Sequence, residues 1–296
     1  MSRETLTCFI PAGGEGTRLK PHTNRIPKPM LPMGDPERKL IDYALNVSEN
    51  CEHILVSTNF DPEKAVCVEE YARRIPGVTI LRDKRLAIGA ASLIDYFDIL
   101  SHEDSNGDMV IIPADHVFEA VDLFRFQDYH QELRANITLL VVPALDYGDY
   151  ALVKDGFVER VVKRKIRDSL SITGVYIIRN RYLLDWIRKE LINGWEGEGR
   201  SMSRDLIIPA VSKDKVAAYL LPENGYWDDA GTIHRYYNNN MRLSGGRNVI
   251  SSNAQIAPDV PINSSVVING PIIDKDLGLN RTIISGSNRD YNITFL

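Results

Sequence analysis

The residues best suited to chemistry lie in a glycine-rich stretch over residues 10–33. Gly13 and Gly14 let the backbone adopt positive φ and approach a ligand closely, so that successive N–H groups can point at one anion. Arg18 and Lys28 follow in the same stretch and add full positive charge to the partial charges of the amides. The stretch is therefore predicted to bind phosphate groups, and a nucleoside triphosphate fits that prediction.

Two common phosphate-binding motifs do not describe this stretch. A dinucleotide-binding fingerprint would need a third glycine where Leu19 stands and an acidic residue near residues 57–59. A P-loop would need a Gly-Lys-Ser/Thr sequence, which does not follow at the required distance. An ordinary surface turn stays open as an alternative.

The complete string is more specific than its glycines. It reads Gly-Gly-x-Gly-Thr-Arg-Leu-x-Pro-x-Thr over residues 13–23, followed by Lys-Pro-Met-Leu-Pro over residues 28–32. This string resembles the signature of the sugar-1-phosphate nucleotidyltransferases, also called nucleotide-sugar pyrophosphorylases. The resemblance implies that the nucleotide is bound by Ala12, Gly13 and Gly14 and that the catalytic residues are Arg18 and Lys28.

Strands and helices are predicted to alternate through the first half of the chain. Apolar runs predict strands over residues 6–10, 53–58, 78–81 and 109–113, and helical spacing predicts helices over residues 39–47, 62–74 and 87–100. This order is typical of an α/β fold with a Rossmann-like, mostly parallel mixed sheet, whose ligands bind at the carboxyl ends of the strands. The glycine-rich stretch and Asp115 are expected at that same edge.

Asp115 directly follows the apolar strand over residues 109–113. A carboxylate in this place either caps the next segment or binds a hard cation, and Mg²⁺ on phosphates typically takes one or two protein carboxylates. Spacing alone leaves both roles open. The family carries an acidic metal ligand here, and Asp-His-Val-Phe over residues 115–118 is most similar to the ADP-glucose pyrophosphorylase branch, which is glucose-1-phosphate adenylyltransferase-like.

A second aspartate lies in Tyr-Trp-Asp-Asp-Ala-Gly-Thr-Ile, residues 226–233. This string resembles the family's Tyr-Trp-Glu-Asp-x-Gly-Thr-Ile, and the resemblance makes Asp229 the second ligand of Mg²⁺. Thr232 can also cap a helix that runs to about Leu243. The two roles are compatible, because one glycine turn can present Asp229 and start the helix.

The middle of the chain resembles the sugar-phosphate motifs of the family, which implies that Ala151, Lys163 and Gly174 bind the sugar phosphate. The family usually has Glu-Lys-Pro where this chain has Val162-Lys163-Arg164. Valine cannot accept a hydrogen bond from a sugar hydroxyl, which argues against plain glucose 1-phosphate and leaves a sugar-like cyclitol 1-phosphate open. Lys163 could instead belong to a solvated basic run over residues 163–167.

The nucleobase is not decided by the sequence. In related enzymes a polar side chain about five residues before a Gly-Thr-Ala stretch reads the base, and the matching residues here are Lys84 and Gly89, with Ala90 in place of threonine. Lysine offers only donors, which suits the carbonyl groups of guanine or a pyrimidine better than the amino group of adenine. The likeness to ADP-glucose enzymes favours adenine.

The last fifty residues carry a different pattern. Beyond Gly245-Gly246, isoleucine recurs every six residues at positions 250, 256, 262 and 268. This period predicts a short left-handed β-helix of hexapeptide repeats over residues 245–296, after a nucleotidyltransferase domain over residues 1–244. Two or three coils are too few to cap themselves, so a homo-oligomer through this segment is expected. An irregular β-rich tail is the alternative.

The composition limits the possible partners and compartments. The 296 residues have a net charge of −5, which argues against a general nucleic-acid binder. No apolar run approaches membrane-spanning length, and no signal peptide precedes the first strand. Cys8, Cys51 and Cys67 have no metal-type spacing. A cytoplasmic protein without membrane or nucleic-acid partners is therefore predicted.

Together these features predict an enzyme that joins a sugar or cyclitol 1-phosphate to an NTP and releases pyrophosphate, with Mg²⁺ as cofactor. The alternative from another class is a non-catalytic nucleotide- or sugar-binding subunit, because the departures at Lys84, Val162 and Arg164 are what a loss of activity would produce. An acyltransferase built on the hexapeptide coils is disfavoured, since residues 245–296 contain no histidine.

Overall fold

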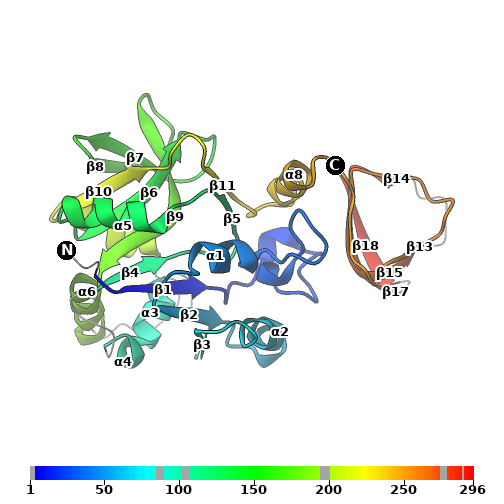
Figure 1. Ribbon diagram of the computed structural model, residues 1–296, viewed down its shortest axis with the longest axis horizontal. Coiled ribbons are helices and arrows are strands. Elements are labelled where there is room, and N and C mark those ends of the chain that lie inside the picture. Colours follow the sequence, from blue (N-terminus) through cyan, green and yellow to red (C-terminus); the bar gives the residue numbers. More distant parts are fainter. Residues whose placement is uncertain (1–3, 85–89, 102–106, 194–200, 274–278, 289) are drawn as a thin grey trace. The chain divides into compact units, whose positions relative to one another are not determined.

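The computed structural model describes residues 4–84, 90–101, 107–193, 201–273, 279–288 and 290–296 (Figure 1). The chain divides into two compact units. Unit 1 comprises Met1–Gly14, Ala44–Pro113 and Phe118–Trp227. Unit 2 comprises Glu15–Tyr43, Ala114–Val117 and Asp228–Leu296. The predicted domains, residues 1–244 and 245–296, stay a prediction.

Unit 1 is built on a nine-stranded sheet with the order β3-β2-β1-β4-β9-β6-β10-β8-β7. Its strands are β1 (Leu6–Pro11), β2 (His53–Thr58), β3 (Val78–Arg82), β4 (Asp108–Ile111), β6 (Ile137–Pro143), β7 (Tyr150–Lys154), β8 (Phe157–Val162), β9 (Ser169–Arg179) and β10 (Val216–Leu220). The first four strands are parallel to one another, as predicted, and β10 is parallel to β6. β9 is antiparallel to β4, β6 and β7, and β8 is antiparallel to β7 and β10. The mixed α/β sheet is thereby confirmed.

Helices connect the parallel strands because a parallel pair needs a crossover. The helices that follow strands of unit 1 are α1 (Ile41–Val47), α2 (Pro62–Ala72), α3 (Ala90–Asp95), α4 (Phe97–Leu100), α5 (Leu123–Glu132), α6 (Asn180–Ile192) and α7 (Ile208–Val211), the last preceded by a π-helix, η3 (Met202–Ile207). The carboxylates of Asp61 and Asp122 cap α2 and α5. The helix predicted over residues 87–100 is described from Ala90 onward and is divided into α3 and α4.

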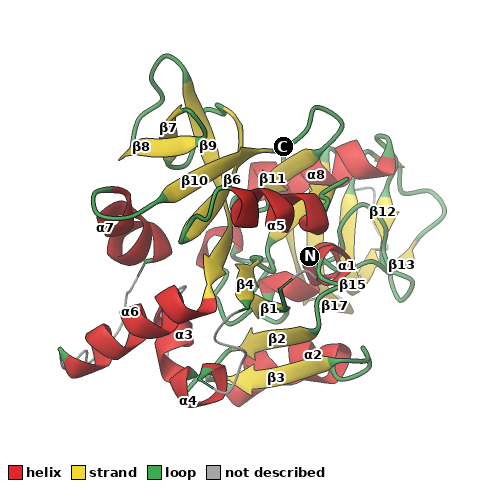
Figure 2. Ribbon diagram, turned by 60° about the vertical axis from the view of Figure 1, so that its left-hand side comes forward, coloured by secondary structure: helices red, strands yellow, loops and turns green. Residues whose placement is uncertain are grey.

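One apolar core cluster of unit 1 packs helices against the sheet. Phe9, Leu55 and Leu81, on three neighbouring strands, pack with Leu93 of α3 and Leu183 of α6. Helix α5 packs against β6 and β10, as Figure 2 shows. Burial of the apolar side chains fixes the strands, and the strands fix the loops at their carboxyl ends.

Unit 2 collects the turns that follow the glycines, a short segment around residue 115 and the C-terminal part of the chain. Its elements include two short 3-10 helices, η1 (Thr17–Leu19) and η2 (Lys28–Met30), and the helix α8 (Ile233–Ser244). The strands β5 (His116–Glu119) and β11 (Tyr226–Asp229) form a two-stranded sheet. Thr232 caps α8, as predicted, because its Oγ1 accepts a hydrogen bond from the Arg235 N–H.

The C-terminal segment consists of short strands in small sheets. They are β12 (Val249–Ile250), β13 (Gln255–Ile256), β14 (Ile262–Asn263), β15 (Val266–Ile273), β16 (Leu279–Asn280), β17 (Thr282–Asn288) and β18 (Asp290–Phe295). β15 is parallel to β12, β13 and β17, and β14 is parallel to β16. β18 is antiparallel to β17, so it does not continue the parallel pairing of the preceding strands. These pairings establish a β-rich segment and do not by themselves establish a closed helix.

None of the helices in the described part of the chain combines the length and the apolar character needed to span a bilayer.

Candidate functional site

Unit 2 brings together four predicted residues from distant parts of the sequence. The Lys28 Nζ donates to the Asp115 Oδ2 at 2.6 Å. The Ala230 N–H donates to the Asp115 carbonyl oxygen at 3.0 Å, which joins the segment before β5 to the turn after β11. A side chain at Gly231, in that turn, would collide with the Asp229 carboxylate. Lys28, Asp115 and Asp229 therefore meet in one place.

Arg18 lies at the same turn. A Cβ atom at Gly231 would be 3.3 Å from the Arg18 Nη2, so the guanidinium borders the glycine that follows Asp229. The positive charge of Arg18 also acts on the carboxyl group of Asp115. The two residues predicted to be catalytic and the two predicted metal ligands thus belong to one cluster within unit 2.

The carboxyl group of Asp115 is strongly biased toward its ionised form. Burial alone would raise its pKa, but the charges of Lys28, His116 and Arg18 outweigh burial and hold the pKa well below its ordinary value. His116 has a lowered pKa because burial disfavours its charged form. The nearest contact between the two is 3.4 Å, from Nε2 to Oδ1. The site therefore presents a carboxylate, a buried ammonium group and a mostly buried imidazole.

Asp229 is bound through both of its oxygens. Its Oδ2 accepts a hydrogen bond from the Arg235 Nη1 at 2.7 Å, and its Oδ1 accepts one from the Gly231 N–H. The Asp229 and Arg235 side chains are only 19% and 17% exposed. Sequence reasoning missed Arg235. The signal was present, because Arg235 lies in the first turn of the helix that starts at the predicted cap Thr232.

The glycines of unit 1 follow β1 and face different surroundings. The Gly13 carbonyl oxygen accepts a hydrogen bond from the Asn59 Nδ2 at 2.6 Å. A side chain at Gly13 would collide with the Asp83 carboxylate, whereas a Cβ atom at Gly14 would meet nothing within 4 Å. Ala12 is buried at the end of β1. Packing thus requires glycine at position 13, and Gly14 borders open space.

Asp83, which follows β3, was not predicted. Its Oδ1 accepts a hydrogen bond from the Tyr96 hydroxyl at 2.8 Å, while its Oδ2 is buried without a hydrogen-bond partner in the described part of the chain. Burial raises the pKa of Asp83 to about 7. The predicted residue Lys84 is next in sequence and is exposed, and Gly89 lies outside the described residues.

The residues predicted to bind the sugar phosphate lie on β7, β8 and β9. Ala151 is buried in β7, and Gly174 in β9 has a φ of 86°, which favours glycine. The Lys163 Nζ contacts both carboxylate oxygens of Asp149, at 2.8 and 2.7 Å. Ser203 donates to the same carboxylate at 2.6 Å. Lys163 is therefore paired, although it also lies in an exposed run over residues 163–167, so both interpretations stay open. Sequence reasoning missed Asp149.

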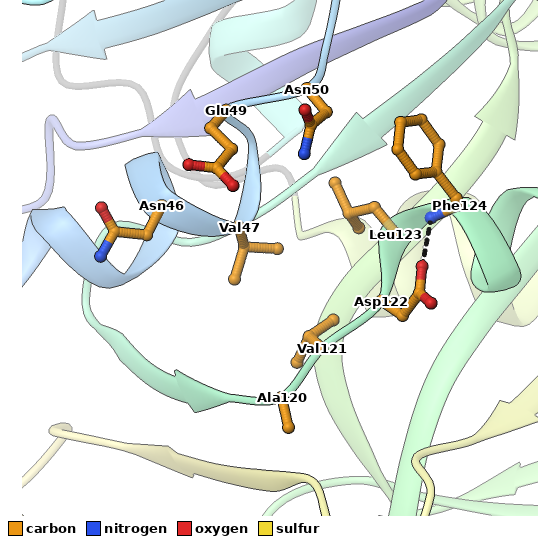
Figure 3. Close-up of a pocket in the computed structure, with 9 residues that line it drawn as sticks. All are labelled: Asn46, Val47, Glu49, Asn50, Ala120, Val121, Asp122, Leu123 and Phe124. Carbon is orange, nitrogen blue, oxygen red and sulfur yellow. Dashed lines mark hydrogen bonds between the residues drawn. The ribbon is translucent and has the colours of Figure 1, made fainter.

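A separate pocket of about 320 Å³ lies between the end of α1 and the start of α5. Figure 3 shows Asp122 in its wall with a hydrogen bond from the Phe124 N–H, and the Arg125 N–H donates to the same oxygen. The carboxylate already occupies the amides that an anion would use, and no predicted site residue lines the pocket. This pocket is therefore not the candidate site.

Known proteins resemble most of the chain. The family model described as nucleotidyl transferase matches residues 8–245. The glucose-1-phosphate adenylyltransferase of Thermosipho africanus is 25% identical over 81% of this chain and 62% of its own length. That of Geobacillus stearothermophilus is 25% identical over 89% of this chain and 76% of its own length. The chain therefore spans less than two thirds of the Thermosipho relative.

A solved structure shows the same fold. It is a Bacillus anthracis protein proposed to be a glucose-1-phosphate thymidylyltransferase, in complex with sucrose. It aligns with a TM-score of 0.65 at 20% identity and covers 81% of this chain and 96% of its own. Since the family model matches well over half of the residues, the chain belongs to the nucleotidyl transferase family.

Proposed function

We propose that the protein joins a sugar 1-phosphate, or a sugar-like cyclitol 1-phosphate, to an NTP and releases pyrophosphate. The observation that carries this proposal is the cluster of Arg18, Lys28, Asp115 and Asp229 in unit 2. Its groups are those that a triphosphate needs, namely cations for the phosphates and carboxylates for a metal ion. Family membership and relatives named glucose-1-phosphate adenylyltransferase support it.

The residues of this chain would act mainly by position and charge. An oxygen of the sugar phosphate attacks the α-phosphorus in line, and pyrophosphate leaves. Arg18 would bind the α-phosphate and the leaving pyrophosphate, Lys28 would bind the α-phosphate, and Lys163 would orient the attacking phosphate. Ala12, Gly13, Gly14, Lys84 and Gly89 would border the nucleotide, with Ala151 and Gly174 beside the sugar. The protein needs no covalent step of its own.

The two aspartates fit a magnesium ion in number and kind. Mg²⁺ usually takes one or two protein carboxylates and completes its shell with phosphate oxygens and water. Asp115 is held ionised by its neighbours, as metal binding requires. The described residues hold no group of three acidic, histidine or cysteine side chains that could bind a metal without substrate. A bound Mg²⁺ would neutralise charge on the triphosphate.

We also propose that residues 245–296 form a short left-handed β-helix through which the protein forms a homo-oligomer. Val249 pairs with Val266 and Ile262 with Leu279, in each case 17 residues further on, close to three hexapeptides. Figure 1 shows β14 on a different side of this segment from the β15–β17–β18 sheet, and β13 pairs with the end of β15. The three cysteines form no disulfide, in keeping with the proposed cytoplasmic location.

The test is a pyrophosphate-release screen. ATP, GTP, UTP and dTTP are each combined with hexose and cyclitol 1-phosphates in the presence of Mg²⁺. At least one pair should release pyrophosphate, and the Asp115→Asn variant should release it far more slowly. If every pair fails while the protein still binds a nucleotide or a sugar phosphate, the chain is the non-catalytic subunit instead.

A further inference from the structure

The cluster in unit 2 contains a cation that its sequence motifs do not include. The Arg235 Nη1 donates to the Asp229 Oδ2 at 2.7 Å. A Cβ atom at Gly231 would lie 2.7 Å from the Arg235 Nη2 and 3.3 Å from the Arg18 Nη2. Both guanidinium groups therefore border the same glycine, and Arg235 is mostly buried there.

The fold fixes Arg235 relative to Asp229. The Arg235 N–H donates to the Thr232 Oγ1 that caps α8, so the turn that carries Asp229 also sets the direction of the helix. With no side chain at Gly231, the guanidinium can reach Asp229 across the turn. The turn therefore holds this contact in place, whereas a salt bridge between two exposed long side chains is not held in one geometry.

Two cations and one carboxylate border Gly231, namely Arg18, Arg235 and Asp229. In the wider cluster Lys28 adds one positive charge, and Asp115 and Asp228 add two negative charges, so the free site is balanced. Once a metal ion takes up Asp229, the two guanidinium groups lose the anion beside them. A guanidinium fork matches phosphate oxygens in pairs, so a phosphate can take the place of that carboxylate.

The inference rests on the proposed function. We propose that Arg235 is a second phosphate-binding arginine of this site, which pairs with Asp229 in the free protein and binds the pyrophosphate part of the NTP together with Arg18 when Asp229 takes up the metal ion. Arg235 then has two successive partners. It first occupies the carboxylate that the metal needs, and it afterwards stabilises the charge that accumulates on the leaving group.

The proposal predicts opposite effects on two binding reactions of the whole protein. In Arg235→Ala, Asp229 loses its competing cation, so Mn²⁺ should bind the nucleotide-free protein several-fold more tightly, as measured by electron paramagnetic resonance. Magnesium pyrophosphate should bind about tenfold or more weakly, as measured by calorimetry, because a charge-assisted contact is lost. Arg242→Ala removes an exposed arginine from the same helix and should change neither value.

Arg235→Lys is the companion variant if the alanine variant does not fold. Lysine keeps the charge and loses the fork, so magnesium pyrophosphate should bind several-fold more weakly. Circular dichroism of each variant checks the fold.

Three results would overturn the inference. Unchanged pyrophosphate binding in Arg235→Ala would make the arginine only a counter-ion of Asp229, and weaker Mn²⁺ binding would make it a support for the carboxylate. Unchanged values for both ligands would make Arg235 irrelevant to the site. These outcomes leave the proposed function intact if the wild-type protein releases pyrophosphate in the screen. A wild-type protein that neither releases nor binds pyrophosphate would remove the function itself.

Discussion

The charged cluster of unit 2 and the buried Asp83 of unit 1 hold their carboxyl groups in different ways. In unit 2, Lys28 faces Asp115 and Arg235 faces Asp229, and each of these pairs is at least half-buried. In unit 1, the buried carboxyl group of Asp83 faces a tyrosine hydroxyl instead of a cation. Burial favours charge only where an opposite charge is supplied. The cations of unit 2 therefore keep Asp115 ionised, whereas Asp83 of unit 1, which faces a tyrosine, has a raised pKa. Glu69 of unit 1 behaves like Asp115, because Arg82 and Arg73 pair with it and lower its pKa.

The pair of Lys163 and Asp149 extends this comparison. It joins the same kinds of residue as the pair of Lys28 and Asp115, but the Lys163 side chain is 65% exposed and that of Lys28 only 8%. An exposed pair contributes little to stability and can be separated at small cost. Lys163 is thus available to a substrate phosphate, whereas Lys28 is fixed before any ligand binds.

The largest effect is expected from the carboxylates of unit 2. Asp115→Asn and Asp229→Asn each keep the shape and lose a negative charge, so turnover should fall by about 100- to 1,000-fold if these groups bind the metal ion. The measurement is pyrophosphate release at saturating Mg²⁺. The exposed Asp168→Asn is the control and should leave the rate unchanged. Wild-type rates in both site variants would show that the metal assignment is wrong.

The next effect concerns the buried carboxyl group of unit 1. The pKa of Asp83 is about 7 in the folded protein and near 4 in the unfolded chain, so the unfolded chain binds fewer protons between these values and stability falls as pH rises. We expect a loss of about 2–3 kcal/mol in unfolding free energy between pH 5 and pH 8 from this group. Asp83→Asn should remove that loss, as measured by urea denaturation.

The control for Asp83 is Asp98→Asn, an exposed position on α4 that should leave the pH dependence of the wild-type protein intact. Equal slopes in wild type and Asp83→Asn would contradict the assignment of Asp83 as a carboxyl group kept neutral by burial.

A buried histidine in unit 2 should give the opposite trend. The His22 Nδ1 lies 2.7 Å from the Ser285 Oγ and its Nε2 lies 2.8 Å from the Thr294 Oγ1, and burial lowers its pKa to about 4. The unfolded chain binds more protons between pH 4 and 6.5, so stability is lost as pH falls through this range. The loss between pH 7 and pH 5 should be about 2 kcal/mol.

Denaturation of His22→Gln measures this effect, because glutamine cannot take up a proton in this range. The exposed His53→Gln serves as the matched control. If His22→Gln loses as much stability at low pH as the wild-type protein, a group other than His22 causes that loss.

The sequence predicted the features that depend on residues close to one another in the chain. The alternation of strands and helices, the parallel first half of the sheet and the cap at Thr232 follow from apolar periodicity and from the hydrogen-bonding chemistry of single side chains. The approach of the glycine-rich stretch to Asp115 was expected from the strand order, because both follow strands of a parallel sheet, and the resemblance to a family supplied only the roles of Lys28 and Asp115.

Pairs formed through space escaped prediction. Asp149 meets Lys163 because β7 and β8 are antiparallel with Tyr150 opposite Val162, and a register is not readable from either strand alone. Asp83 lies against Gly13 because β3 and β1 end at the same edge, on either side of β2. In the C-terminal segment the six-residue period indicated strands. It did not give the offset of 17 residues between paired residues, because that offset depends on how many residues the intervening turns contain.

The smallest effect, and the one that sharpens the comparison most, concerns Lys163. If Lys163 leaves Asp149 to bind the sugar phosphate, Lys163→Ala should raise the KM for that substrate about tenfold while the melting temperature stays nearly constant, because an exposed pair contributes less than about 1 kcal/mol to stability. Lys165→Ala, which breaks the neighbouring exposed pair with Asp146, is the control and should change neither value. A KM that does not move would reduce the Lys163 pair to a surface contact, and the cations of unit 2 would then have to bind both substrates' phosphates.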